Sequence, residues 1–271
     1  MSSPQGSPLS PLSWNITIAH LLGKELPYET HTQAFADDIV IIVQLKSRKD
    51  AEEKTNRLLK ISNDWAVGKE ITINNDKSQA MTIGKQYGTH PPILQIGSSR
   101  IKTVNEMKLL RVIIDNKLTF LPHLKYLNEK IAKITYNLNR TLNDDKSSKR
   151  ELVRVMYKRG IERILTYAAP VWYTRKVTIL RKLQAIQRLP LLMITKAFKI
   201  TSNLSLNIMA KFPPVYLTIE KEIEQYGVVK EGKTFSCDDK LYTSNQIMKK
   251  YDLWTNHQQI KTELLSLPQK N

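Results

Sequence analysis

The spacing of apolar and polar positions is typical of strands in some segments of the chain and of helices in others. Residues 34–43 are almost wholly apolar and β-branched, which favours a buried strand. In residues 50–65, Ala51, Leu58 and Leu59 recur at helical spacing between charged residues, which predicts an amphipathic helix. Shorter apolar runs predict strands at 71–74, 81–83, 93–96, 101–104 and 107–114.

The second half of the chain is predicted to be helical. Apolar residues from Leu124 to Leu138, and again around Leu152, recur three or four positions apart. Pro213 and Pro214 end this region, because neither can continue a helix, and residues 215–228 predict one more helix. A helix laid on an antiparallel sheet, followed by an all-helical region, indicates an α+β fold.

Two adjacent carboxylates, Asp37 and Asp38, interrupt the apolar run at 34–43. Two neighbouring anions repel each other, and a hard divalent cation such as Mg²⁺ or Mn²⁺ relieves both charges with oxygen ligands. The pair is also typical of a hairpin turn, since Asp is a common turn residue. The two interpretations are compatible, and the pair alone does not choose between them.

Composition indicates a polyanionic partner. The 271 residues carry 42 Lys and Arg against 25 Asp and Glu, a net charge of +17. Residues 125–199 hold 18 basic and 5 acidic residues, which is +13 of that total. This charge favours nucleic acid over an anionic membrane as the partner. Within the basic region, Arg150, Arg154 and Lys158 lie at i, i+4 spacing and predict a phosphate-binding stripe, although such a row can also be a solvated face.

Cys237 is the single cysteine, so neither an intrachain disulfide nor a Cys-rich zinc site is possible. Residues 1–15 lack the pattern of a signal peptide, and no apolar run approaches the ~20 residues of a membrane span. We expect an intracellular protein of the nucleus or cytoplasm without a membrane partner.

Several motifs occur in an order that resembles the reverse transcriptases of non-LTR (LINE-type) retrotransposons. Pro4-Gln5-Gly6-Ser7 is similar to motif B of that family, and Phe35-Ala36-Asp37-Asp38 to its motif C. Residues 74–77 look like motif D and residues 110–115 like motif E. Residues 164–173 and 183–188 are similar to the region after the thumb, so the resemblance covers about residues 4–220.

The resemblance implies roles for individual residues. Asp37 and Asp38 would hold Mg²⁺ or Mn²⁺, and Lys77 would protonate the leaving pyrophosphate, although a solvated surface lysine is an equal alternative. The residues expected beside the incoming nucleotide and template are Gln5, Gly6, Ser7, Phe35 and Ala36. The implied partners are an RNA template, a DNA primer and deoxynucleoside triphosphates. Arg111 stands where the family usually has Gly, which predicts an altered turn in motif E.

The resemblance also predicts a domain order: a partial palm at 1–118, a helical thumb or connection region at 119–214 and a tail at 215–271. In the family, motif A and its essential aspartate precede motif B, where this sequence starts. We therefore expect a truncated reverse transcriptase that binds metal weakly and is weak or inactive alone, its missing N-terminal half supplied by another polypeptide if at all. The alternative is a metal-independent nucleic-acid-binding remnant or accessory protein.

Overall fold

The computed structural model divides into two compact units, and among the described residues the first unit ends at Met107 and the second begins at Lys108. Both units combine helices with short strands, as an α+β fold requires. The described residues are 7, 9–24, 30–44, 47–84, 91–141, 146–231, 235–237 and 240–242. The predicted site residues Gln5 and Gly6 lie outside them.

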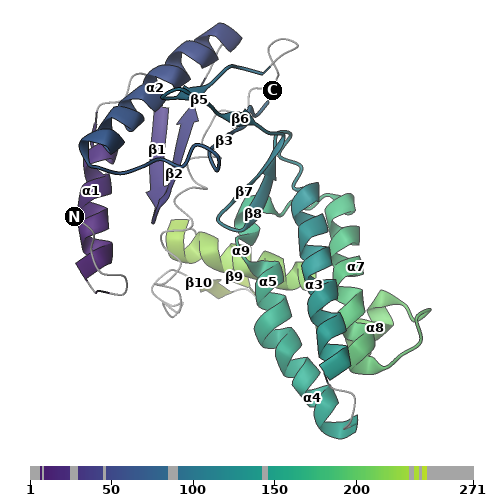
Figure 1. Cartoon of the computed structure of the whole chain (residues 1–271). Helices are drawn as coiled ribbons and strands as arrows, with labels where there is room; N and C mark the ends of the chain where they lie inside the picture. Colours follow the sequence, from purple (N-terminus) through teal and green to yellow (C-terminus); the bar gives the residue numbers. More distant parts are fainter. Residues whose placement is uncertain are drawn as a thin grey trace. The chain divides into compact units, whose positions relative to one another are not determined.

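The first unit is built on an antiparallel hairpin. Its strands are β1 (Thr30–Phe35) and β2 (Asp38–Val43), paired from Thr30 with Val43 to Phe35 with Asp38. Helix α1 (Leu9–Leu22) packs beside β1, and the long helix α2 (Arg48–Gly68) contacts β2 (Figure 1). Ser47 starts α2, because its side chain accepts a hydrogen bond from the Asp50 N–H.

One face of this hairpin forms the core of the unit. Ala34 and Ile39 pack against a buried cluster of α1 and α2 residues, which contains Ile18 and Trp65. Ile41, on the same face, packs against a second cluster that includes Leu59 of α2. The apolar stripe predicted in α2 is thus the surface that covers the sheet. The predicted hairpin, with its motif C residues at the turn and a helix on one face, is confirmed.

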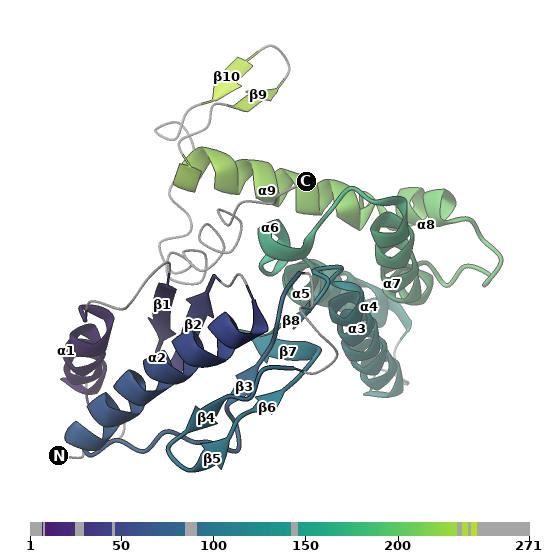
Figure 2. The ribbon, with the colours of Figure 1, turned by 90° about the horizontal axis from the view of Figure 1, so that it is seen from above.

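Four short strands complete the first unit. They are β3 (Gln79–Ala80), β4 (Gln95–Ile96), β5 (Ser99–Arg100) and β6 (Lys102–Thr103). β4 pairs antiparallel with β5, and β3 pairs parallel with β6 (Figure 2). The predicted strands at 71–74 and 81–83 are wrong. Ile71 and Ile73 are apolar because they pack against the core clusters, and they do so without strand pairing.

The division between the units falls within a second hairpin, β7 (Glu106–Leu109) and β8 (Val112–Asp115). Leu110 and Arg111 form its two-residue turn, with φ angles of 45° and 68°. Positive φ at both positions is the type I′ pattern that suits a tight hairpin. The sequence had predicted one strand over 107–114 and an altered turn. The single strand is wrong, and Arg111 adopts the conformation usually left to Gly.

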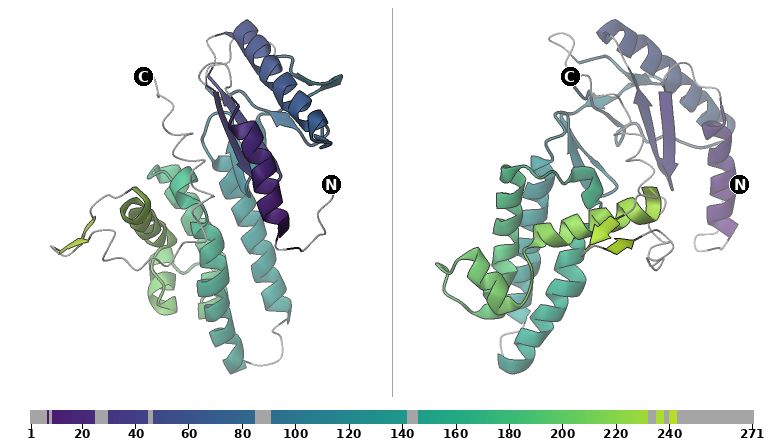
Figure 3. Two further views of the ribbon diagram at one scale, coloured as in Figure 1. Left: turned by 90° about the vertical axis from the view of Figure 1, so that its left-hand side faces the viewer. Right: turned by 180° about the vertical axis from the view of Figure 1, so that it is seen from behind.

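The second unit is otherwise almost entirely helical. Its elements are α3 (Leu121–Thr141), α4 (Lys146–Met156), η1 (Tyr157–Ile161), α5 (Glu162–Thr166), α6 (Ala169–Trp172), α7 (Val177–Thr195), α8 (Asn203–Ala210), α9 (Val215–Glu231), β9 (Phe235–Cys237) and β10 (Lys240–Tyr242). Figure 3 shows α3 and α7 side by side, and α7 also contacts α4, α8 and α9. Its buried core includes Leu165, Trp172, Leu183 and Ile219.

Gln187 ties three parts of this unit together. Its Nε2 donates to the Tyr157 hydroxyl at 2.8 Å and to the Pro213 carbonyl at 2.9 Å. Its Oε1 accepts from the N–H of Val215, the first residue of α9. The predicted helix at 215–228 is confirmed as α9, which packs on α5, α6 and α7. Among the described helices, none combines the length and apolarity needed to cross a membrane.

Candidate functional site

The two candidate metal ligands lie at the tip of the first hairpin. Ala36 and Asp37 form the two-residue turn, and Asp38 is the first residue of β2. Ala36 has a φ of 50°, a left-handed conformation that costs energy for a residue with a Cβ. Asp37 and Asp38 are both exposed, and neither forms an ion pair among the described residues. The turn therefore presents both carboxylates to solvent.

Helix α1 anchors this turn. The indole Nε1 of Trp14 donates to the carbonyl of Ala36 at 2.6 Å, across 22 residues of sequence. Trp14, Ile18 and Leu21 lie at helical spacing and join the same core cluster. This contact fixes the backbone immediately before the carboxylates. Trp14 was not among the predicted site residues, although its helical spacing from Ile18 and Leu21 indicates that it lies on the buried side of α1.

The donor chemistry of the turn fits a hard cation. Carboxylate oxygens are the ligands that Mg²⁺ prefers, and both groups here are accessible. Within the described ranges, no group of three or more His, Cys, Asp or Glu side chains is placed to hold a metal. Asp37 and Asp38 would thus supply a small part of an octahedral shell.

Asp115, another acidic residue near the motifs, has a structural task. Its carboxylate accepts from the Thr119 N–H and hydroxyl and from the Phe120 N–H, at 2.6 to 3.0 Å. Burial raises the pKa of Asp115, but these hydrogen bonds outweigh burial and hold the pKa below its usual value. Asp115 therefore shapes the loop before α3.

The other residues predicted at the active site lie on separate pieces of backbone. Phe35 ends β1 opposite Asp38, so it shares the turn with the carboxylates. Ser7 lies two residues before the first residue of α1, and its carbonyl accepts a hydrogen bond from the Ser10 N–H. Lys77 is exposed in a turn, and its backbone N–H donates to Asn74 Oδ1. Among the described residues, its side chain forms no ion pair with Asp37 or Asp38. The structure thus brings together Phe35, Ala36, Asp37 and Asp38.

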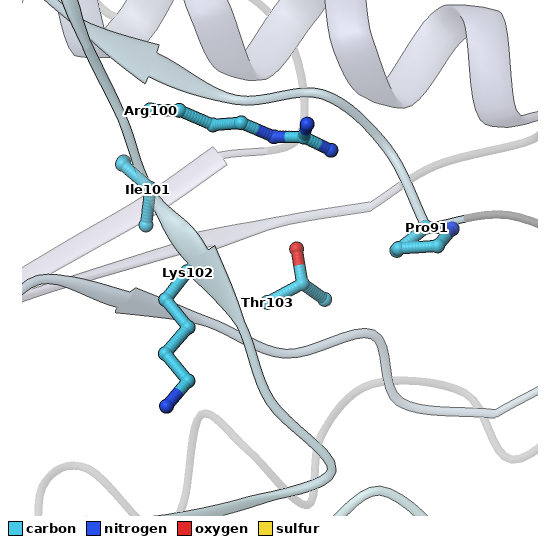
Figure 4. Close-up of a pocket in the computed structure, with 5 residues that line it drawn as sticks. All are labelled: Pro91, Arg100, Ile101, Lys102 and Thr103. Atoms are coloured by element: carbon cyan, nitrogen blue, oxygen red, sulfur yellow. The ribbon is translucent and has the colours of Figure 1, made fainter.

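A shallow hollow of about 290 Å³ lies beside β5 and β6 of the first unit. Figure 4 shows the side chains of Arg100 and Thr103 extending toward the space that Pro91 borders, while Lys102 points away from it. None of the predicted site residues lines this hollow.

The predicted basic stripe is partly engaged within the protein. Lys158 Nζ lies 2.6 Å from Oε1 of the buried Glu162. Arg154 lies over the Phe212 ring at 5.2 Å and 3.8 Å from the Glu151 carboxylate. The π-helical turn η1 also adds a residue to the helical turn and so disturbs the i, i+4 register at Lys158. The backbone of Arg150 lies in α4, and its side chain is outside the described part of the structure.

A second cationic surface lies on α3 and β7. Lys108 and Lys130 place their ammonium groups 4.9 and 5.8 Å from the centre of the Tyr126 ring. Lys133 and Arg140 follow on the same side of α3 at helical spacing. None of these four cations forms a salt bridge with a described carboxylate. We call Lys108, Tyr126, Lys130, Lys133 and Arg140 the α3 cationic face. None of these four cations was singled out from the sequence, since the predicted stripe lies in other residues.

The hairpin, its carboxylate turn and the helix behind it lie within residues 2–148, which match the family described as Reverse transcriptase (RNA-dependent DNA polymerase). The match covers more than half of the chain, so the chain belongs to the reverse transcriptase family. The relatives below come from non-LTR retrotransposons, in agreement with the resemblance seen in the motifs.

Three curated relatives illustrate this similarity. A 115 kDa protein in type-1 retrotransposable element R1DM of Drosophila melanogaster is 27% identical over 88% of the chain. The Pol polyprotein from element R1 of Bradysia coprophila is 26% identical over 63%, and the RNA-directed DNA polymerase from mobile element jockey of Drosophila funebris 27% identical over 68%. The matches cover 23%, 17% and 20% of those proteins, so the chain spans about a fifth of their length. No solved structure shows significant similarity to the chain.

Proposed function

We propose that this chain is a part of a non-LTR retrotransposon reverse transcriptase that carries the motif C carboxylates and is weak or inactive as a polymerase by itself, with RNA-directed DNA polymerisation as the reaction it serves. The observation that carries this proposal is the exposed Asp37-Asp38 pair at a two-residue turn, anchored by Trp14 within a family match. In this proposal the first unit corresponds to the palm, and the helical unit to the thumb and connection region.

Asp37 and Asp38 would hold the catalytic ions. When bound, divalent metal activates the primer 3′-hydroxyl and neutralises the charge on the triphosphate. The chain's own contribution is to fix the two carboxylates, because the Trp14 contact holds the turn carbonyl that precedes them. The same proposal includes protonation of the leaving pyrophosphate by Lys77. It also includes nucleotide and template contacts from Gln5, Gly6, Ser7, Phe35 and Ala36.

Tested by itself, the chain should bind Mg²⁺ weakly. Two exposed carboxylates leave most of an octahedral shell to water. Isothermal titration calorimetry with MgCl₂ should give a Kd of the order of millimolar, the weak end of protein carboxylate sites. A tight site that Asp37→Asn abolishes would contradict this and would identify a further ligand in the chain.

A second candidate function is nucleic-acid binding without metal. The helical unit holds most of the net charge, and the α3 cationic face offers cations free of salt bridges to described carboxylates, beside an aromatic ring. Lysine side chains held beside an aromatic ring by cation–π contacts supply a positioned attraction for phosphates. The stripe at Arg150, Arg154 and Lys158 remains a proposal for the same task.

One experiment separates the two functions. Primer extension by the purified chain on an RNA template with Mg²⁺ should be weak or absent, while binding of the same primer–template persists in EDTA. Two triple variants locate the binding surface: Lys108, Lys130 and Lys133 to Ala, and Arg150, Arg154 and Lys158 to Ala. We expect the first to weaken binding more, because Lys158 already pairs with Glu162. Robust extension that Asp37→Asn abolishes would show that the chain is a complete polymerase.

A further inference from the structure

The helical unit displays an apolar surface that its own described residues do not cover. Five side chains of the α7–α8 loop and of α8 are between 55% and 94% exposed. They are Phe198, Ile200, Leu204, Ile208 and Met209. We call these five residues the α8 apolar surface. It lies apart from both hairpin turns in the sequence and carries none of the residues assigned above to nucleotide or metal binding.

Helix α8 is apolar on both of its sides. Leu206 and Ala210 are fully buried, and α8 packs on α7. Leu204 and Ile208, one helical turn apart, point away from that contact and are each 68% exposed. Large apolar side chains that are exposed on one side of a helix and in the loop before it are typical of interaction sites.

The loop that carries Phe198 and Ile200 is held by hydrogen bonds. Arg188 of α7 donates through Nη1 to Asn203 Oδ1 at 2.6 Å and through Nη2 to the carbonyl of Lys199. The Thr201 N–H donates to the Phe198 carbonyl at 3.0 Å, which closes a turn between the two apolar residues. The exposed side chains therefore sit on a fixed backbone, and a fixed backbone reduces the ordering cost of binding.

The charged residues next to these five side chains in the sequence have one sign. Lys196, Lys199 and Lys211 flank them along the chain and are exposed, and the sequence contains no Asp or Glu from residue 163 to residue 219. An apolar surface with a rim of cations matches an amphipathic helix whose apolar stripe is bordered by carboxylates. We propose that the α8 apolar surface docks an acidic amphipathic helix of a protein partner.

Other occupants fit the surface less well. A second copy of the chain brings a net charge of +17, and the chain's own residues 243–271 carry four Lys against two acidic residues, so both repel the lysine rim. Single-stranded nucleic acid binds through aromatic stacking, whereas Phe198 is the single aromatic ring among the five residues.

The test uses the full chain and a display library of random peptides of about 16 residues, enough for about four helical turns. Selection on the wild type, with depletion on the Phe198→Ser/Ile208→Ser variant, should enrich peptides with apolar residues three or four apart and with Asp or Glu beside them. In fluorescence anisotropy, an enriched peptide should bind the double variant at least about tenfold more weakly than the wild type. The same peptide should bind Val177→Ser, which changes an exposed residue at the other end of α7, as it binds the wild type.

A Lys199→Glu/Lys211→Glu variant, which leaves every apolar residue in place, should also weaken acidic peptides and favour lysine-bearing versions of them. Enrichment of basic peptides, or of none, would overturn the proposal. So would a dimer in sedimentation analysis that the double variant abolishes, or loss of oligo(U) binding in that variant. None of these experiments measures polymerase activity, so failure of the docking proposal can be told apart from failure of the function proposed above.

Discussion

The two hairpin turns of this protein share a length and an aromatic hydrogen-bond donor but differ in their surroundings. Each turn has two residues, and each holds a residue other than glycine at positive φ: Ala36 in the first, Leu110 and Arg111 in the second. In each, an aromatic side chain from a helical segment donates to the first turn carbonyl, Trp14 to Ala36 at 2.6 Å and Tyr167 to Leu110 at 3.0 Å. In both turns, a residue at positive φ therefore has a carbonyl that accepts a hydrogen bond from an aromatic side chain distant in the sequence.

The difference lies in what surrounds each turn. The first exposes Asp37 and Asp38, whereas the second hairpin rests on buried groups. The Ile113 N–H of β8 lies 3.4 Å from Nδ1 of His123, whose ring is 1% exposed and meets Trp172 edge-on at 5.4 Å. The exposed carboxylates of the first turn can therefore stay ionised in water. The second hairpin instead depends on a buried imidazole that has to stay neutral.

Acid should distinguish the two hairpins most strongly. Burial lowers the pKa of His123 from 6.5 to about 4, so the folded protein holds the neutral ring where the unfolded chain already binds a proton. The share of the free energy of unfolding that depends on the neutral His123 ring is fully present above pH 6.5. It decreases by about 3 kcal/mol as the pH falls toward 4. Hydrogen exchange corrected for intrinsic pH dependence should show β8 losing protection between pH 6.5 and 4.5, and β1–β2 changing less.

A His123→Phe variant provides the control, because it keeps an aromatic ring and removes the titrating group. Its β8 protection should be insensitive to pH over the same range. Equal acid loss in both hairpins of the wild type, or an unchanged pH response in His123→Phe, would contradict the assignment.

Removing the two aromatic donors should have a smaller effect. Tyr167→Phe deletes the hydroxyl that donates to Leu110 and leaves a part-buried carbonyl without that partner, which should lower the free energy of unfolding by about 1 kcal/mol. Trp14→Phe deletes the donor to the more exposed Ala36 carbonyl, which water can replace, but it also shortens a ring that packs against the core cluster, so we expect a loss at least as large. Urea unfolding of the two variants measures both effects, and an unchanged stability in Trp14→Phe would contradict the anchoring role of this ring.

Glycine substitutions in the turns should have the smallest effects. Arg111→Gly relieves positive φ at the second turn position, against a gain of unfolded-chain entropy, and should stabilise the protein by up to about 1 kcal/mol. Ala36→Gly should act in the same direction. Thermal unfolding of each variant against wild type is the measurement, and Lys117→Gly, at an exposed position without positive φ, should not stabilise.

The sequence predicted the first hairpin because its signals are local. The apolar run at 34–43, the Asp pair and the helical spacing after residue 50 all lie within one stretch. The second hairpin was missed because Leu110 and Arg111 carry none of the residue preferences of a tight turn. Their conformation is accompanied by Tyr167, 57 residues away, a contact that no local pattern reveals.

The candidate site was predictable to a similar degree. The motif order identified Asp37 and Asp38, and the structure places them at one exposed turn. Lys158 pairs with the buried Glu162 four residues further on, an i, i+4 spacing that is present in the sequence but that the stripe interpretation left out. The α3 cationic face escaped notice because Lys108 reaches Tyr126 from another element.

The most direct test of the account is the salt dependence of nucleic-acid binding by the wild-type chain. If the cations of the helical unit contact about 5 phosphates, the slope of log K against log salt on duplex DNA should be roughly −4. Binding should be insensitive to sequence, because phosphate contacts carry no base information, and Asp37→Asn should leave the slope unchanged. A slope near zero, or a slope that requires Mg²⁺ and an intact Asp37, would contradict a basic helical unit that binds nucleic acid independently of the carboxylate turn.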